Sequence, residues 1–236
     1  MAVRRCWGVV PAAGSGSRMA AGLPKQYLQL AGATLLEHSL NALLADTRLA
    51  GVVVALPPQD SIAASLPVCA DARVQRVTGG QERSDSVRAA LTALLQQGDA
   101  QDWVLVHDAA RPCLQAQILD RLIERVTASG TGGLLAVPIV DTVKQGTSEG
   151  LVARTLDRSR LWRAQTPQMF RLGELHAALA SAMQRGLAVT DEAAAMELAG
   201  HPVQLVPGSA SNLKVTLPED LQLAAWYLTG NRDSRQ

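Results

Sequence analysis

A glycine-rich loop followed by two positive charges is the first feature of this sequence that could support chemistry. The stretch VVPAAGSGSRMAAGLPKQY runs from Val9 to Tyr27 and carries Arg18 and Lys25. Glycine lets the backbone approach a ligand closely, and successive backbone N–H groups can then point at phosphate oxygens. Together with the two cations, this backbone predicts a nucleoside triphosphate site. A tight turn between a strand and a helix is the alternative interpretation.

Two better-known phosphate-binding loops do not match this stretch. The kinase-type loop needs Lys followed by Ser or Thr after its last glycine, whereas Lys25 stands several residues past Gly16 and precedes Gln26. A dinucleotide fingerprint needs a third small residue where Met19 stands, and an acid at the end of a second strand. The loop therefore predicts a different class of nucleotide site.

A carboxylate follows an apolar run in WVLVHDAARP, where Asp108 comes just before Arg111. Magnesium in nucleotide sites usually keeps several waters and takes one or two carboxylates together with substrate phosphates. Asp108 is thus a candidate Mg²⁺ ligand, and an Asp–Arg pair that closes a turn is the alternative. The four histidines are scattered and resemble neither a metal set nor a catalytic triad.

Two further polar segments have an ordinary structural interpretation. Ser84, Asp85 and Ser86 open a helical pattern, so we expect them to cap that helix, although they could also meet a base or ribose. Lys214, in SASNLKVTLPEDL, lies within or beside a β-like piece. A lysine at such a place is usually a solvated edge charge.

The elements that must position these residues alternate between strands and helices. Buried strands are expected at five short apolar runs: Cys6–Val10, Gly51–Leu56, Arg73–Val77, Trp103–His107 and Gly133–Val137. Helical patterns start at Thr34, in capping-box register with Glu37, and at Arg83, where Gly98 reads as the stop. This order predicts an α/β fold with a mostly parallel sheet and helices on both faces, and ligands beyond the carboxyl ends of the strands.

The alternation breaks after Val137. The segment from Pro138 to Trp162 has short β-like pieces around the polar tip QGTSEG and reads as a hairpin arm, taken as residues 138–160. Isolated hairpins are marginal in water, so such an arm needs another surface, and a second subunit is the natural supplier. Later elements are expected as three helices and one strand: Leu172–Gly186, Thr190–Gly200, Pro218–Thr229 and Val203–Val206.

Length and composition favour one soluble domain, residues 1–236, that acts on small molecules. Lys and Arg total 22 against 21 Asp and Glu, which gives no case for general binding to nucleic acid or a membrane surface. The three cysteines are isolated, and we find no signal peptide and no apolar run long enough to span a membrane. A cytoplasmic location is therefore expected.

Taken together, the motifs resemble one enzyme family. PAAGSGSRM with PKQY, GGQERSDSV, VHDAARP, DTVK, DRSRLWRAQTPQ, TDEA and NLKVTLPEDL occur in the order and spacing of the 2-C-methyl-D-erythritol 4-phosphate cytidylyltransferases, from Val9 to Leu228. The resemblance implies a single Rossmann-like nucleotidyltransferase domain with a protruding β-arm for dimerisation. It also implies that CTP and methylerythritol 4-phosphate react with Mg²⁺ present to give 4-diphosphocytidyl-2-C-methyl-D-erythritol and pyrophosphate in the non-mevalonate isoprenoid pathway.

By position, the resemblance also implies roles for single residues. Arg18 and Lys25 are similar to the pair that stabilises charge at the transferring phosphoryl group, Lys214 to the lysine that joins them, and Asp108 to the carboxylate near the metal. Further implied binding positions are Ala12, Ala13, Gly14, Gly80 and Ser86 around the nucleotide, Ala109 and Thr166 elsewhere in the site, and Arg111 beside the substrate hydroxyls.

The arm and two substitutions complete this comparison. Thr142 and Arg158 match arm residues that, in the family, reach the methylerythritol phosphate of the neighbouring subunit. Ser17 stands where many relatives carry a second basic residue, and Gln81 stands where an acid is common. A cytidylyltransferase for another polyol phosphate, such as ribitol 5-phosphate, is the nearest alternative. The other is a catalytically silent nucleotide-binding subunit, which would be expected to lose charges that this chain retains.

Overall fold

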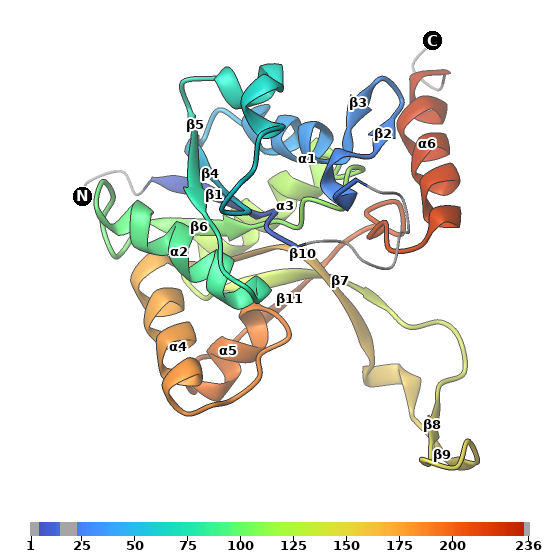
Figure 1. Ribbon diagram of the computed structural model, residues 1–236. Coiled ribbons are helices and arrows are strands. Elements are labelled where there is room, and N and C mark those ends of the chain that lie inside the picture. Colours follow the sequence, from blue (N-terminus) through green and yellow to red (C-terminus); the bar gives the residue numbers. More distant parts are fainter. Residues whose placement is uncertain (1–4, 15–22, 234–236) are drawn as a thin grey trace.

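The computed structural model describes residues 5–14 and 23–233 (Figure 1). Its main sheet has seven strands, ordered β11 (Gln204–Pro207), β7 (Gly133–Pro138), β10 (Trp162–Arg171), β6 (Trp103–Val106), β1 (Cys6–Pro11), β4 (Leu49–Leu56) and β5 (Val74–Thr78). All neighbours pair in parallel except β10, which is antiparallel to both β6 and β7. The predicted α/β architecture with a mostly parallel sheet is confirmed, and the predicted strand ends shift by one or two residues.

Helices cover both faces of the sheet because strand residues alternate between two cores. On β1, Val10 packs with α1 (Leu35–Leu44) and α3 (Ala116–Ser129), whereas Val9 packs with α2 (Arg83–Leu95), α4 (Leu172–Gln184) and α5 (Glu192–Leu198). Each core holds fully buried leucines. Because both cores exclude water, alternate residues of each strand are held on opposite faces of the sheet. A sixth helix, α6 (Pro218–Asp233), packs over the small hairpin of β2 (Gln29–Leu30) and β3 (Ala33–Thr34).

Strand β10 has no clear signal in the sequence. No element is predicted between Trp162 and Leu172, because Pro167 and several polar residues interrupt the pattern of a strand. Its pairing with β7 shifts register between Ala164 and Gln168, so the proline, which has no N–H to donate, lies in the irregular stretch. The strand brings Thr166 beside the end of β6.

The starts of the first two long helices differ in how well they were predicted. The Thr34–Glu37 capping box of α1 is confirmed, since the Glu37 N–H donates to Thr34 Oγ1 at 3.1 Å. For α2 the capping residue is Glu82, whose N–H donates to the Asp85 carboxylate at 3.3 Å, so the expected capping role is confirmed for Asp85 and wrong for Ser84 and Ser86. Helix α2 also ends at Leu95 rather than at Gly98.

The arm leaves the body between β7 and β10. It contains the two-stranded hairpin of β8 (Lys144–Gly146) and β9 (Val152–Thr155), followed by a 3-10 turn at Arg158–Arg160. Figure 1 shows this hairpin extending well away from the rest of the chain. The division of the whole chain into one domain stays a prediction. No helix within the described ranges is long and apolar enough to cross a membrane.

Candidate functional site

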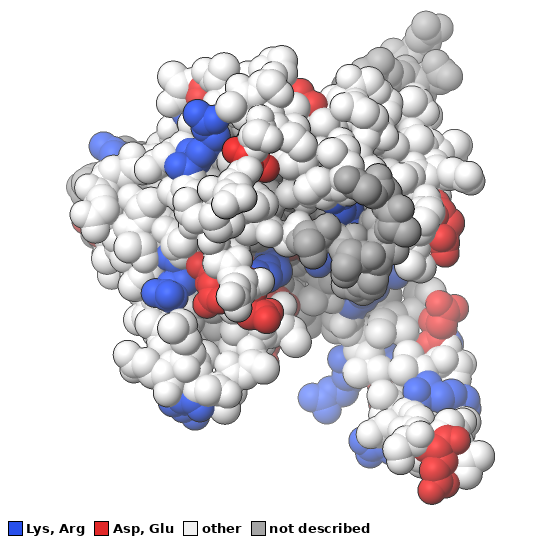
Figure 2. Space-filling model, viewed as in Figure 1, with Lys and Arg blue, Asp and Glu red and all other residues white. Residues whose placement is uncertain are grey.

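A cavity of about 270 Å³ lies beyond the carboxyl ends of β1 and β6. The strand order changes direction between these two strands, which is where open α/β sheets bind ligands. Its lining is drawn from five segments and includes Ala12, Ala13, Gly14, Lys25, Gly80, Gln81, Arg83, Ser86, Asp108, Ala109 and Lys214. The structure therefore brings together most of the residues singled out for the nucleotide. Figure 2 shows Lys and Arg side chains around a hollow on this face, with Asp and Glu at its edge.

Short contacts hold the described part of the glycine-rich loop. The Gln26 side chain donates to the Ala12 carbonyl at 2.8 Å and so ties the Lys25 turn to the end of β1. Across the cavity, Ser86 Oγ accepts from the Gly80 N–H at 3.1 Å. A Cβ added at Gly80 would lie 2.3 Å from the Asp85 Cβ, so a glycine is required for α2 to start so close to the loop. Arg18 and Ser17 lie outside the described residues.

A second, smaller cavity of about 160 Å³ adjoins the first. Arg83, Asp108 and Lys214 line both cavities, and the second one adds Arg111, Ala164, Gln165, Thr166, Gln168, Thr190 and Asp191. These three shared charged residues form the wall where ligands in the two cavities would meet. We call Arg83, Asp108 and Lys214 the shared wall.

Asp108 is the centre of charge in this wall. Its carboxylate contacts Arg83 Nε and Lys214 Nζ, each at 2.9 Å, and Arg111 Nε at 3.6 Å. Burial would raise the pKa of this carboxyl, but the positive charges of Arg83 and Lys214 outweigh that effect and hold the pKa well below its ordinary value. Asp108 is therefore ionised in any ordinary buffer. The expectation that Lys214 sits beside a β-like piece is wrong, since its segment forms no strand.

The shared wall also has a buried neighbour, Glu192. This carboxylate is 1 % exposed and accepts from Arg83 Nη1 at 2.6 Å and from Nη2 at 3.1 Å. Arg83, Arg111 and Lys214 face the carboxylates of Asp108 and Glu192, and the Asp191 carboxylate also lines the smaller cavity, so the charges of these six side chains balance. Arg83 and Glu192 were not assigned a role from the sequence. The motifs that contain them, GGQERSDSV and TDEA, were the available signal.

His107 connects β6 to the segment around Thr166 without carrying a charge. The Asp108 N–H donates to Thr166 Oγ1 at 3.0 Å, Thr166 lies 3.0 Å from His107 Nδ1, and His107 Nε2 lies 3.1 Å from the Arg111 carbonyl. Complete burial lowers the pKa of His107 to about 4, against an ordinary value of 6.5. A neutral ring that donates from Nε2 and accepts at Nδ1 satisfies both contacts.

The segment that carries Lys214 is fastened to the sheet on both sides of the lysine. The Val215 N–H donates to the Ala110 carbonyl at 2.8 Å, and the Asn212 side chain donates to the Thr166 carbonyl at 2.7 Å. Arg111 Nη1 donates to the Asn212 carbonyl, also at 2.7 Å. These bonds place the lysine at the shared wall although its segment has no regular structure.

Two predicted residues lie apart from both cavities. Thr142 and Arg158 are exposed on the arm, and Arg158 donates a hydrogen bond to the Val140 carbonyl within the arm itself. Neither residue lines the cavities of its own chain.

At the shared wall, Mg²⁺ would have one protein ligand, Asp108. The described residues contain no group of three His, Cys, Asp or Glu side chains that could hold a metal. Asp108 uses one position on each oxygen for Arg83 and Lys214, and a carboxylate offers about four positions in total. Mg²⁺ commonly takes its other ligands from water and phosphates. Asp108 can thus hold the ion together with a bound triphosphate.

The fold and this site define a nucleotidyltransferase of the α/β class: a switch-point cavity lined by cations, beside a second cavity that shares its charged wall. The family model described as IspD, 2-C-methyl-D-erythritol 4-phosphate cytidylyltransferase, matches residues 6–230. The chain belongs to this family.

Relatives and solved structures agree with this assignment. The chain is 55% identical to the 2-C-methyl-D-erythritol 4-phosphate cytidylyltransferase of Pseudomonas savastanoi pv. phaseolicola over 217 residues, 92% of each chain. It is 52% identical to the enzyme of the same name from Pseudomonas entomophila over 227 residues, 96% of this chain and 97% of that one. The crystal structure of the Francisella tularensis enzyme has a TM-score of 0.82 at 36% identity, covering 94% of this chain and 99% of that one.

Proposed function

We propose that this protein transfers a cytidylyl group from CTP to 2-C-methyl-D-erythritol 4-phosphate. An oxygen of the acceptor phosphate attacks the α-phosphorus of CTP, the bond from this phosphorus to the α–β bridging oxygen breaks, and pyrophosphate leaves with the electron pair. The product is 4-diphosphocytidyl-2-C-methyl-D-erythritol, an intermediate of non-mevalonate isoprenoid synthesis. The observation that carries the proposal is the shared wall, because two adjoining cavities with a common cationic wall suit two phosphorylated substrates.

The larger cavity is the proposed CTP site. Ala12, Ala13 and Gly14 offer backbone groups and little side chain, which suits close contact with the base and phosphates. Gly80, Ser86 and Ala109 complete the proposed nucleotide contacts. An amino group at C4 and a carbonyl at C2 of cytosine call for one acceptor and one donor, which backbone atoms can supply.

The proposed chemistry needs cations rather than a protein nucleophile. In phosphoryl and nucleotidyl transfer the protein mostly positions reactants and neutralises developing charge. Lys25 and Lys214 line the CTP cavity and are proposed to stabilise charge on the triphosphate. Arg18, which lies outside the described residues, is proposed to join them. Mg²⁺, held by Asp108 and the phosphates, would neutralise charge on the triphosphate when bound.

The smaller cavity is the proposed acceptor site. Arg111 lines it with only 11% of its side chain exposed, and Thr166 lies on the same wall. Arg83 and Lys214 face it from the shared wall, so an acceptor phosphate would meet several cations there. This cavity, rather than the nucleotide cavity, must select between methylerythritol phosphate and another polyol phosphate.

We further propose that two copies of the chain pair through the arm. Val140, Leu151 and Val152, in the arm, are 74%, 63% and 63% exposed, which is costly for apolar side chains on a segment this small. In the proposed dimer, Thr142 and Arg158 reach the acceptor cavity of the partner. Sedimentation that finds a fully active monomer at micromolar concentration would contradict this pairing.

The cytoplasm is the proposed location. Cys6, Cys69 and Cys113 are buried free thiols, as suits a reducing compartment. Recovery of the native protein from the periplasmic fraction of its host would contradict this location.

Pyrophosphate release tests the reaction directly. The purified protein with Mg²⁺ is offered each of the four ribonucleoside triphosphates with methylerythritol 4-phosphate and, separately, with ribitol 5-phosphate. Release with CTP and methylerythritol phosphate alone is expected. Release with the ribitol acceptor would overturn the acceptor assignment, and no release from any pair would indicate a silent nucleotide-binding subunit. Omitting Mg²⁺ or adding EDTA should abolish release.

A further inference from the structure

Glu192 is a buried carboxylate that lines neither substrate cavity yet contacts a residue that lines both. It is the first residue of α5 and accepts two hydrogen bonds from the terminal nitrogens of Arg83, at 2.6 and 3.1 Å. Such a paired contact fixes the plane of the guanidinium as well as its position. Burying a carboxylate is costly unless it is paired, so the contact also compensates for the burial of Glu192.

The remaining nitrogen of Arg83 faces the reaction centre. Its Nε donates to Asp108 Oδ1 at 2.9 Å, while Lys214 occupies Asp108 Oδ2 at the same distance. Arg83 is thus held at one end by Glu192 and at the other by Asp108. A guanidinium free of Glu192 could turn its two terminal nitrogens onto Asp108 and compete with Lys214 for Oδ2.

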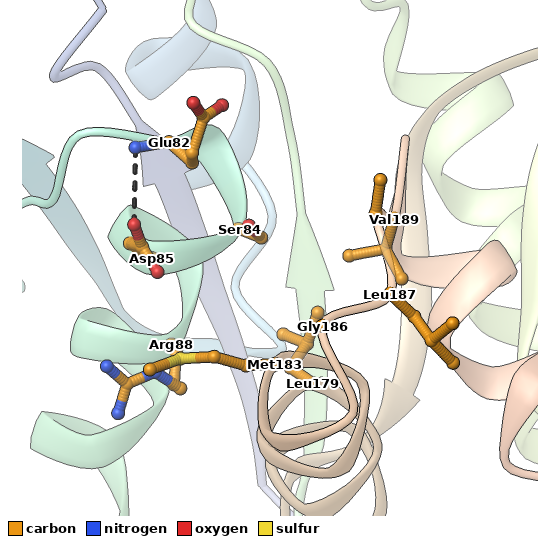
Figure 3. A pocket seen from close by; sticks show the side chains of 10 residues that line it. Glu82, Ser84, Asp85, Arg88, Leu179, Met183, Gly186, Leu187 and Val189 are labelled. Atoms are coloured by element: carbon orange, nitrogen blue, oxygen red, sulfur yellow. Dashed lines mark hydrogen bonds between the residues drawn. The ribbon is translucent and has the colours of Figure 1, made fainter.

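The contact also joins two helices, α2 and α5, that are far apart in the sequence. Arg83 begins α2, and Glu192 lies 109 residues later. Figure 3 shows the first turn of α2 opposite the end of α4 and the segment with Leu187 and Val189 that leads to α5, across a largely apolar cavity of about 330 Å³. Beside that cavity, the Arg83–Glu192 contact ties the first turn of α2 to the start of α5.

We propose that Glu192 is a positioning residue for the transfer reaction. It orients Arg83 so that Asp108 keeps Lys214 on its other oxygen, and the three charges of the shared wall stay in place where the two substrates meet. Glu192 touches no substrate and acts through Arg83. This inference rests on the proposed function, because it assigns Glu192 a part in that same transfer.

The first test is the steady-state kinetics of Glu192→Gln with CTP and methylerythritol phosphate. Glutamine keeps the length of the side chain and one acceptor oxygen but removes the charge and one of the two bonds to Arg83. We expect kcat to fall at least tenfold while the KM for CTP changes less than threefold. Glu197→Gln, at the exposed end of the same helix, is the matched control and should keep wild-type kcat.

The second test separates positioning from a general loss of structure. If Glu192 acts through Arg83, then adding Glu192→Gln to an Arg83→Gln variant should lower kcat by less than twofold further. Glu192→Asp keeps the charge on a shorter side chain, and its kcat should fall less than that of Glu192→Gln. The aspartate variant also provides the test if the glutamine variant folds poorly.

Three results would overturn the inference. Wild-type kcat in Glu192→Gln would show that Arg83 needs no such partner. An equal loss in the presence and absence of Arg83 would show that Glu192 acts by another route. A wild-type protein that releases no pyrophosphate overturns the proposed function itself, and with it this role for Glu192, whereas an active wild type with an unaffected variant overturns the role alone.

Discussion

Replacing Lys214 by methionine removes the most exposed charge of the shared wall while keeping a long apolar stem. A full charge about 4 Å from one developing negative charge is worth roughly 4 kcal/mol at an effective dielectric near 20. The Lys214 side chain is 42% exposed, so solvent screens it. Doubling the dielectric to about 40 leaves about 2 kcal/mol, and we therefore expect kcat to fall about 30-fold.

The assay is pyrophosphate release at saturating CTP and methylerythritol phosphate, with KM measured for each substrate. Arg125→Met, on the exposed face of α3, removes one positive charge away from the site and serves as the control for net charge. Folding should be kept, because Asp108 retains Arg83 at 2.9 Å and Arg111 at 3.6 Å.

Two outcomes would refute this reasoning. A loss of less than threefold in kcat would mean that solvent screens Lys214 almost completely or that it points away from the α-phosphate during transfer. A rise in the KM for CTP with unchanged kcat would mean that the lysine contributes equally to the bound substrate and the transition state, and so binds rather than catalyses.

Three other expectations follow from the same geometry. Arg111→Gln should raise the KM for methylerythritol phosphate about tenfold, since Arg111 lines only the smaller cavity, and should raise the KM for CTP less, through its bond to the segment of Lys214; an equal rise in both would contradict the assignment of the two cavities. Gly80→Ala should destabilise the fold by about 1–3 kcal/mol in urea unfolding, because its Cβ would lie 2.3 Å from that of Asp85, whereas Gly230→Ala, with 3.7 Å to its nearest neighbour, should not. The pKa of His107 is lowered from 6.5 to about 4, so the unfolded chain binds this proton first as the pH falls, and stability is complete above pH 6.5 and declines towards pH 4. This amounts to about 2 kcal/mol between pH 7 and pH 5, and His107→Gln should show a correspondingly smaller loss over that range in chemical denaturation.

Local patterns predicted the parts of the fold that depend on local contacts. The capping box at Thr34 was found because both partners lie within one helical turn, and β1, β4, β6 and β7 were found because each is a short, mostly apolar run. The prediction of a buried strand at Arg73–Val77 is wrong in its burial, since β5 is an edge strand with no buried residue. The position of the nucleotide cavity could then be predicted from the loops that follow the strands, since the carboxyl ends of parallel strands meet at one edge of the sheet.

The parts that were missed depend on contacts between distant segments. Strand β10 is stabilised by pairing on both sides, which overrides the weak signal of a strand that contains Pro167. The contact of Arg83 with Glu192 joins residues 109 apart, and a single charged residue gives no sign of its partner. The roles of Lys25, Asp108 and Lys214 stay predictions, although the structure places all three around the same cavity.

The start of strand β10 fixes the distance from the base of the arm to the reaction centre, whereas the tip of the arm sets how long the arm is. From Trp162 at the base of the arm to Thr166 beside Asp108 is four residues, about 13 Å of extended chain. Inserting one residue here would move Thr166 away from the Asp108 N–H, because their hydrogen bond of 3.0 Å depends on this spacing. Residues added at the tip, between Thr147 and Gly150, would only lengthen the hairpin. The arm can thus grow or shrink at its tip while the spacing between its base and Asp108 stays the same.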